Sequence, residues 1–92
     1  MKEGHMVRKR ETTVKAKIIS KNTFISSKER SLHSVYILQT NFITFELEDD
    51  SRLVLEVSPI VFSYFIEGDD GILTYKSNSE SVTFIDFKRY SR

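Results

Sequence analysis

The segment EGDDGILTY, residues 67–75, gathers acidic residues that could form a reactive site. The segment holds three carboxylates and two of the chain's three glycines, and such a group could bind a cation or move a proton. An EF-hand loop, however, needs carboxylates at alternating positions and a bidentate Glu at the twelfth, which here falls on Glu80, beyond a whole predicted strand. We therefore interpret Gly68, Asp69 and Gly71 as a structural turn between two elements.

Other residues that could take part in catalysis lack the required arrangement. Glu46 and Glu48 share one face of a predicted strand, but a two-carboxylate hydrolase needs the pair held across a cleft with separated pKa values. Neither His5 nor His33 belongs to a set with metal-ligand or nucleophile–base spacing. We therefore expect no catalytic residue, no metal site, no cofactor and no enzymatic activity.

Length and composition indicate a single domain. The 92 residues are 39% hydrophobic and 12% aromatic, which suffices for one modest core. The chain has no cysteine, which fits a reducing compartment. No apolar run approaches the roughly 18 to 20 residues of a membrane span, and the N-terminus has no apolar signal-peptide core. We expect a soluble cytoplasmic protein with a flexible basic N-terminus over residues 1–11 and one β-barrel-like domain over 12–90.

Alternation of apolar and polar residues predicts five strands. The first covers residues 12–20, and the second, 41–48, forms a hairpin with the third, 52–57. The last two cover residues 72–76 and 82–90. The predicted core side chains of the first three strands are Val14, Ala16, Ile18, Ile43, Phe45, Leu47, Leu53, Leu55 and Val57.

Two departures from alternation predict further features. Phe84 and Phe87 are three residues apart, which indicates a bulge near Ile85 and Asp86. The segment SPIVFSYFIEG predicts about two turns of helix that end before the glycine. Its cap, first position and helically spaced apolar residues are Ser58, Pro59, Phe62, Phe65 and Ile66.

Residues 22–35 lack clean periodicity and are rich in Ser and other polar residues. We predict a long loop there, and loops of this length are commonly functional or mobile. Residues 36–40 fit a lengthened second strand. The resulting order β-β-β-α-β-β predicts a mainly β fold. This is a small five-stranded bent sheet or partly open barrel, OB-like or SH3-like, with one short helix between strands 3 and 4.

Charges are sorted along the chain. Residues 1–30 carry nine Lys and Arg against three acids (+6), and residues 46–70 carry eight acids against one Arg (−7). The charges cancel if basic and acidic strands are neighbours, and otherwise give a bipolar surface. A patch from the first and last strands would suit nucleic acid or a protein partner. Its candidate contact residues are Lys15, Lys17, Lys21, Lys88 and Arg89, and Phe42 on the second strand is the candidate aromatic residue for stacking.

The segments ITFELEDDSRLVLEV, FSYFIEGDDGILTYKS and FIDFKR together resemble a bacterial domain-of-unknown-function family of the YhhM type. The resemblance covers about residues 12–90. Its most specific part, GD-x-G-x-L-x-Y, is occupied by Gly68, Asp69, Gly71, Leu73 and Tyr75. Phe62 and Phe65 stand where the family often has Tyr and Leu. The resemblance implies a compact β domain and assigns no activity. Family members look membrane-anchored through an N-terminal helix that we do not expect here, so no membrane-side role is carried over.

These observations together predict a non-catalytic protein-interaction or accessory module. The partner is expected to contact segment 22–35 or an exposed edge strand, which can accept a partner strand through backbone hydrogen bonds. A homodimer through an edge strand and a nucleic-acid-binding OB-like module are the alternatives.

Overall fold

Five strands and one short helix make up the described chain, and the computed structural model describes residues 10–31 and 34–90. In chain order the elements are β1 (Arg10–Ser31), β2 (Ser34–Leu47), β3 (Arg52–Val57), α1 (Pro59–Tyr64), β4 (Asp70–Ser77) and β5 (Val82–Arg89). The predicted mainly β fold, with its helix between the third and fourth strands, is confirmed. β1 begins at Arg10, just before the predicted start of the domain, and the rest of the predicted flexible N-terminus, 1–9, lies outside the described residues.

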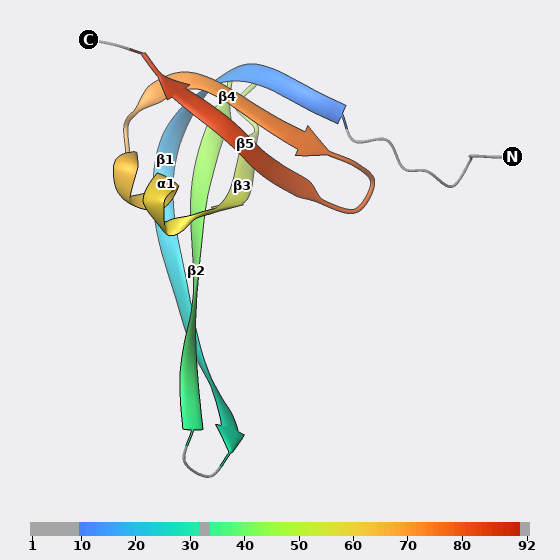
Figure 1. Ribbon diagram of the computed structural model, residues 1–92. Coiled ribbons are helices and arrows are strands. Elements are labelled where there is room, and N and C mark those ends of the chain that lie inside the picture. The colour runs from blue at the N-terminus through green and yellow to red at the C-terminus, as the bar shows by residue number, and fades with distance from the viewer. Residues whose placement is uncertain (1–9, 32–33, 91–92) are drawn as a thin grey trace, which may run out of the picture.

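All five strands belong to one antiparallel sheet in the order β3-β2-β1-β4-β5. Three consecutive strands followed by a fourth that returns beside the first form a Greek key. With β5 added at the edge, this is the arrangement of a partly open OB-like barrel. The sheet bends so that its edges, β3 and β5, approach each other (Figure 1), yet no ladder joins them in the described structure. The barrel is therefore open between these two strands.

The core lies on the concave side of this sheet, and the predicted inward-facing residues fill it. Buried hydrophobic side chains are Ala16, Ile18, Ile43, Phe45, Leu55, Val57, Phe65, Leu73 and Phe87. The other predicted core residues, Val14, Leu47 and Leu53, are partly buried against them. Phe45 is central, because its ring lies 5.3 Å from that of Phe87 and 6.3 Å from that of Phe84.

The predicted bulge in β5 is confirmed. Thr74 pairs with Asp86 and Tyr75 pairs with Phe84, which leaves Ile85 as the extra residue. A strand residue normally alternates faces with its neighbour, and the extra residue resets that alternation. The bulge thereby allows both Phe84 and Phe87 to contact Phe45.

The helix is capped as predicted but is shorter. Ser58 Oγ accepts a hydrogen bond from the backbone N–H of Val61 at 3.3 Å, and Pro59 occupies the first position. The chain leaves the helix at Phe65, whose backbone is extended, so the prediction that Ile66 is helical was wrong. Phe65 is buried, whereas Ile66 is exposed because the turn has already begun.

The prediction of a loop over residues 22–35 was also wrong, whereas the lengthened second strand is confirmed. The described part of this segment belongs to β1 and β2, which pair with each other as far as Ser31 and Ser34. Apolar residues occur on both faces of these strands, so the sequence there shows no two-residue period. The β-branched and aromatic residues nevertheless favour extended structure.

Candidate functional site

A two-stranded arm projects from the barrel. β4 pairs with β1 only as far as Lys17, and β3 pairs with β2 only as far as Asn41. Beyond these points β1 and β2 pair with each other alone among the described strands, and Figure 1 shows them leaving the body as a twisted ribbon. We call residues 22–31 and 34–40 the arm. A strand of ten residues spans about 30 Å.

A bulge at the base of the arm decides which of its residues share a face. Ile18 pairs with Phe45 and Ser20 pairs with Thr44, which leaves Ile19 as the extra residue. A slip of one residue moves every later side chain to the opposite face of a strand. Beyond the bulge the odd-numbered residues of β1 therefore lie on the side of the barrel core. We call this side of the arm its inner face.

The inner face has a polar band followed by an apolar surface. In the band, the Asn41 side-chain oxygen accepts hydrogen bonds from Thr23 Oγ1 at 2.9 Å and from Gln39 Nε2 at 3.2 Å. Asn41 is buried. Farther from the barrel, three aliphatic side chains are 63 to 69% exposed: Ile25, Val35 and Ile37. The band separates these residues from the core, so they cannot pack into it.

The outer face of the arm is also apolar. The rings of Phe24 and Phe42 meet edge to face with centroids 5.6 Å apart, and Phe24 and Leu38 are exposed. Phe42, the predicted aromatic contact, is half-buried in this cluster. Charged residues make up 29% of the chain, yet the side chains described in the arm include no Asp, Glu, Lys or Arg. An uncharged, apolar exposed surface is characteristic of the centre of a protein interface.

A second apolar surface lies on α1, at the base of the arm. Ile60 is 82% exposed and Tyr64 is also exposed. Lys21, on the inner face, donates a hydrogen bond from Nζ to the carbonyl oxygen of Phe65 at 2.7 Å and lies 4.4 Å from the Phe62 ring centroid. These contacts place α1 beside the inner face, and Figure 1 shows the helix next to the point where the arm begins.

The structure does not bring the six candidate contact residues together in one patch. Lys15 and Lys88 flank Ile72 on one face, because Ile72 pairs with both. Lys21 is on the inner face beyond the bulge and bonds to the end of α1. Arg89 lies against Asp69.

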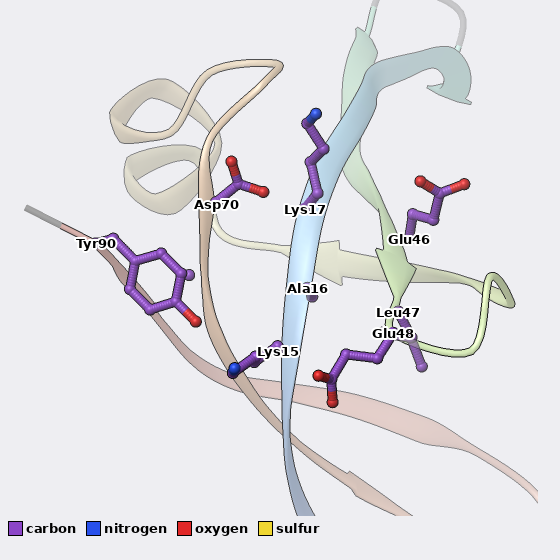
Figure 2. Close-up of a pocket in the computed structure, with 9 residues that line it drawn as sticks. Lys15, Ala16, Lys17, Glu46, Leu47, Glu48, Asp70 and Tyr90 are labelled. Carbon is purple, nitrogen blue, oxygen red and sulfur yellow. The ribbon is translucent and has the colours of Figure 1, made fainter. Parts of the chain in front are cut away.

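Lys17 lies between two carboxylates. It pairs with Glu46 on β2 and with Asp70 on β4, and Arg52 follows Glu46 at 3.9 Å. Figure 2 shows Lys17 with Asp70 to one side and Glu46 to the other. These three residues help to line a hollow of about 230 Å³. Opposite charges on neighbouring strands stabilise each other, and this row follows the expected cancellation. The charges of the hollow thus alternate in sign across the strands.

The acidic turn is tied to two strands by backbone and side chain. Gly68 has a φ of 97° and donates its N–H to the carbonyl oxygen of Ile18 at 2.7 Å. Asp69 is 1% exposed, and its carboxylate accepts a hydrogen bond from the N–H of Ile66 at 3.0 Å. The Arg89 guanidinium lies 3.5 Å from the same carboxylate. These contacts hold residues 66–69 in a tight turn between α1 and β4.

The part of the chain at residues 10–31 and 34–90 contains no group of three or more His, Cys, Asp or Glu that could hold a metal ion. It also contains no helix long and apolar enough to cross a membrane.

The apolar residues of the arm are not identified by sequence reasoning. The sequence predicts segment 22–35 as a contact region, but the candidate contact residues it offers are five basic residues and Phe42. The available signal was the pair of apolar clusters TFI and VYIL, which flank the segment rich in Ser and charge. Their distribution over two faces becomes visible only with the register of β1 and β2.

Comparison with known proteins supports the fold. No family model matches the chain, and no curated protein sequence matches it. The chain is similar to a crystal structure from Proteus penneri ATCC 35198, a Northeast Structural Genomics Consortium target, with a TM-score of 0.71 and 20% sequence identity. That alignment covers 90% of this chain and 99% of the other. At this identity the likeness concerns the fold alone.

Proposed function

We propose that this protein is a non-catalytic interaction module that binds a protein partner through the arm. The observation that supports this proposal is the apolar surface that the arm exposes on both faces, where the described side chains, those of residues 22–27, 35 and 37–40, carry no charge. Monomeric soluble proteins rarely expose contiguous surfaces of this kind, and such surfaces mark protein interaction sites. The barrel then holds the base of the arm in place, while the arm makes the contact.

A second candidate function is nucleic-acid binding by the OB-like barrel. Lys15 and Lys88 on either side of Ile72 favour it, because neighbouring cations can contact phosphates. The alternating charges around Lys17 disfavour it, since a phosphate backbone would also meet Glu46 and Asp70. The two candidates differ in salt dependence, because binding through phosphates weakens steeply as salt rises.

The proposal also covers the family and the cellular location of the protein. We infer membership of the YhhM-type family from the GD-x-G-x-L-x-Y segment, which forms the acidic turn and the start of β4. We also propose a cytoplasmic location, which the absence of cysteine from the sequence supports.

The test is capture of partners from a lysate of the cell that makes the protein. Three baits are compared: the wild type, an arm variant with Phe24→Ser and Ile37→Ser, and a control with Val54→Ser. Val54 is an exposed aliphatic residue on β3, away from the arm. Each capture is repeated after nuclease digestion.

We expect a protein that survives nuclease treatment and binds the wild type and the Val54→Ser control but not the arm variant. Equal capture by all three baits would overturn the proposal. Capture that disappears with nuclease would favour the nucleic-acid alternative, and Lys15 and Lys88 would then be the next residues to substitute.

A further inference from the structure

We propose that the partner of the arm is a second copy of this chain, in a twofold dimer whose two arms pack antiparallel through their inner faces. This inference rests on the proposed function, since it names the partner of the same surface. In the dimer, the end of each arm reaches α1 of the other copy.

The arm cannot cover its own apolar residues. Within the polar band, the pair Thr23 and Asn41 lies between the barrel core and the exposed Ile25 and Ile37, while Gln39 is the ladder partner of Ile25. An isolated two-stranded ribbon is marginally stable in water and becomes stable when a hydrophobic face is packed. The covering surface must therefore come from another molecule.

The inner face and α1 lie where a twofold axis through the arm would bring them into contact between two copies. Ile37 lies near the middle of the arm, Val35 lies toward its end, and α1 stands at its base with Ile60 and Tyr64 exposed. If two arms pack antiparallel about an axis near Ile37, the end of one arm meets the base of the other. Val35 of each copy then reaches the Ile60 and Tyr64 surface of its partner, and one self-complementary interface covers both apolar surfaces.

The size of the apolar surface fits a dimer. A standard interface buries about 800 Å² per partner, of which about 65%, or roughly 500 Å², is apolar in homodimers. Covering a large apolar side chain removes roughly 100 Å² from water. The five exposed side chains of the inner face and α1 therefore supply about the required area: Ile25, Val35, Ile37, Ile60 and Tyr64.

The absence of charge from the described arm side chains favours a copy of the same chain in particular. Two identical surfaces carry the same charge, so a charged face repels its own copy. The inner face has neutral polar and aliphatic side chains from Thr23 to Ser27 and from Ile37 to Asn41. Between these residues the inner face can therefore meet its own copy without opposing charges; the charged residues of this face are Glu29, the ladder partner of Val35, and Lys21 at the base.

The first test is sedimentation of the full chain over a range of concentrations. We expect the wild type and the Val54→Ser control to form a dimer with the same Kd. The double substitution Ile25→Ser and Ile37→Ser should weaken the dimer at least about 100-fold, from about tenfold for each substituted position. Circular dichroism should show that each variant keeps the β structure of the wild type. A wild type that is monomeric at all concentrations, or a double variant that dimerises as the wild type does, would overturn the proposal.

Crosslinking tests which face is used, without disturbing the fold. The chain has no cysteine, so a single introduced thiol can pair only with its copy. We expect Ile37→Cys, near the twofold axis, to form a covalent dimer on mild oxidation, because two Cα atoms must come within about 7 Å for a disulfide. Val54→Cys should stay monomeric under the same conditions. Efficient crosslinking through Leu38→Cys on the outer face, but not through Ile37→Cys, would overturn inner-face packing.

The two proposals fail separately. A monomeric wild type whose capture of a different protein still depends on the arm would overturn the dimer and leave the interaction module standing. A monomeric wild type with no arm-dependent capture would overturn both.

Discussion

The guanidinium of Arg89 lies 3.5 Å from the carboxylate of Asp69, whose side chain is only 2% exposed. This pair joins the end of β5 to the turn between α1 and β4. The same carboxylate oxygen accepts the N–H of Ile66 at 3.0 Å, and Arg89 also stands 5.3 Å above the Tyr64 ring. Asp69 thus shapes the turn and ties it to the last strand.

We predict that Asp69→Ala lowers the free energy of unfolding by about 3 kcal/mol. The substitution leaves the N–H of Ile66 and the guanidinium of Arg89 without this acceptor, and breaking a buried pair or hydrogen bond costs on the order of 1–5 kcal/mol. Asp69→Asn keeps an acceptor oxygen and should cost about half as much. Denaturation in urea measures both values.

The neighbouring carboxylate provides the matched control. Asp70 is exposed, so Asp70→Asn should change the free energy of unfolding by no more than about 0.5 kcal/mol. If the two aspartates cost the same when replaced, Asp69 does not have the structural role described here.

The two glycines of the turn should respond differently to alanine. A Cβ at Gly71 would collide with the carbonyl oxygen of Lys88 and come within 2.9 Å of the Arg89 Cα, both backbone atoms of the paired strand. Gly71→Ala should therefore cost about 3 kcal/mol or more in the free energy of unfolding. At Gly68 the added Cβ meets no described atom within 4 Å, and only the positive φ of 97° opposes it. Gly68→Ala should cost about 1–2 kcal/mol.

Thermal unfolding of the two variants checks this order. A Gly71→Ala protein that melts as the wild type does would mean that β4 and β5 can separate locally, contrary to the observed pairing. A larger loss at Gly68 than at Gly71 would contradict the prediction as well.

The barrel was predictable because its side chains alternate against a single core. RLVLEV, residues 52–57, becomes β3 with the predicted bounds, and the spacing of Phe84 and Phe87 locates the β5 bulge at Ile85. In these strands one face is buried, so burial leaves a period of two in the sequence. That period is what sequence analysis detects.

The arm and the separation of the candidate basic residues were not predictable by the same reasoning. Ile25 and Leu38 face opposite sides and neither side is buried, so no alternating pattern marks the strands. The bulge at Ile19 then places Lys21 on a different face from Lys17, although residues four apart share a face in a strand without a bulge. A bulge without an aromatic signal like that of β5 leaves little trace in the sequence.

Glu46, Lys17 and Asp70 form a row of alternating charges across the sheet, and we predict that its contribution to stability depends on salt. Lys17→Glu would place a third carboxylate between Glu46 and Asp70, and cross-strand charge pairs contribute roughly 0.2–1 kcal/mol each. The free energy of unfolding should fall by about 1–2 kcal/mol at low salt. The loss should shrink at about 1 M salt, where the screening length is roughly 3 Å.

Lys88→Glu is the control for this row, because the ladder partner of Lys88 is Ile72. It should cost no more than about 0.5 kcal/mol at either salt concentration. A loss at Lys17 that does not depend on salt would show that the effect is not electrostatic.

The hairpin between β2 and β3 offers a test by titration. Asp49 Oδ1 accepts hydrogen bonds from Ser51 Oγ at 2.6 Å and from the Ser51 N–H at 3.0 Å. The side-chain hydrogen bond, followed by the backbone one, lowers the pKa of Asp49 below its ordinary value because both favour the ionised form. We predict that Ser51→Ala raises the Asp49 pKa toward that ordinary value, as measured by NMR of the carboxyl carbon during a pH titration.

The sign of the accompanying stability effect follows from the direction of the shift. A carboxylate with a lowered pKa in the folded state stabilises the fold above its ordinary pKa, and that contribution is lost as the pH falls through the folded pKa. The wild type should therefore exceed Ser51→Ala in stability at neutral pH, and this difference should diminish in acid. Ser63→Ala, on α1, should leave the Asp49 titration unchanged. An Asp49 pKa that is the same with and without the Ser51 hydroxyl would show that the hydroxyl does not stabilise the ionised carboxylate in solution.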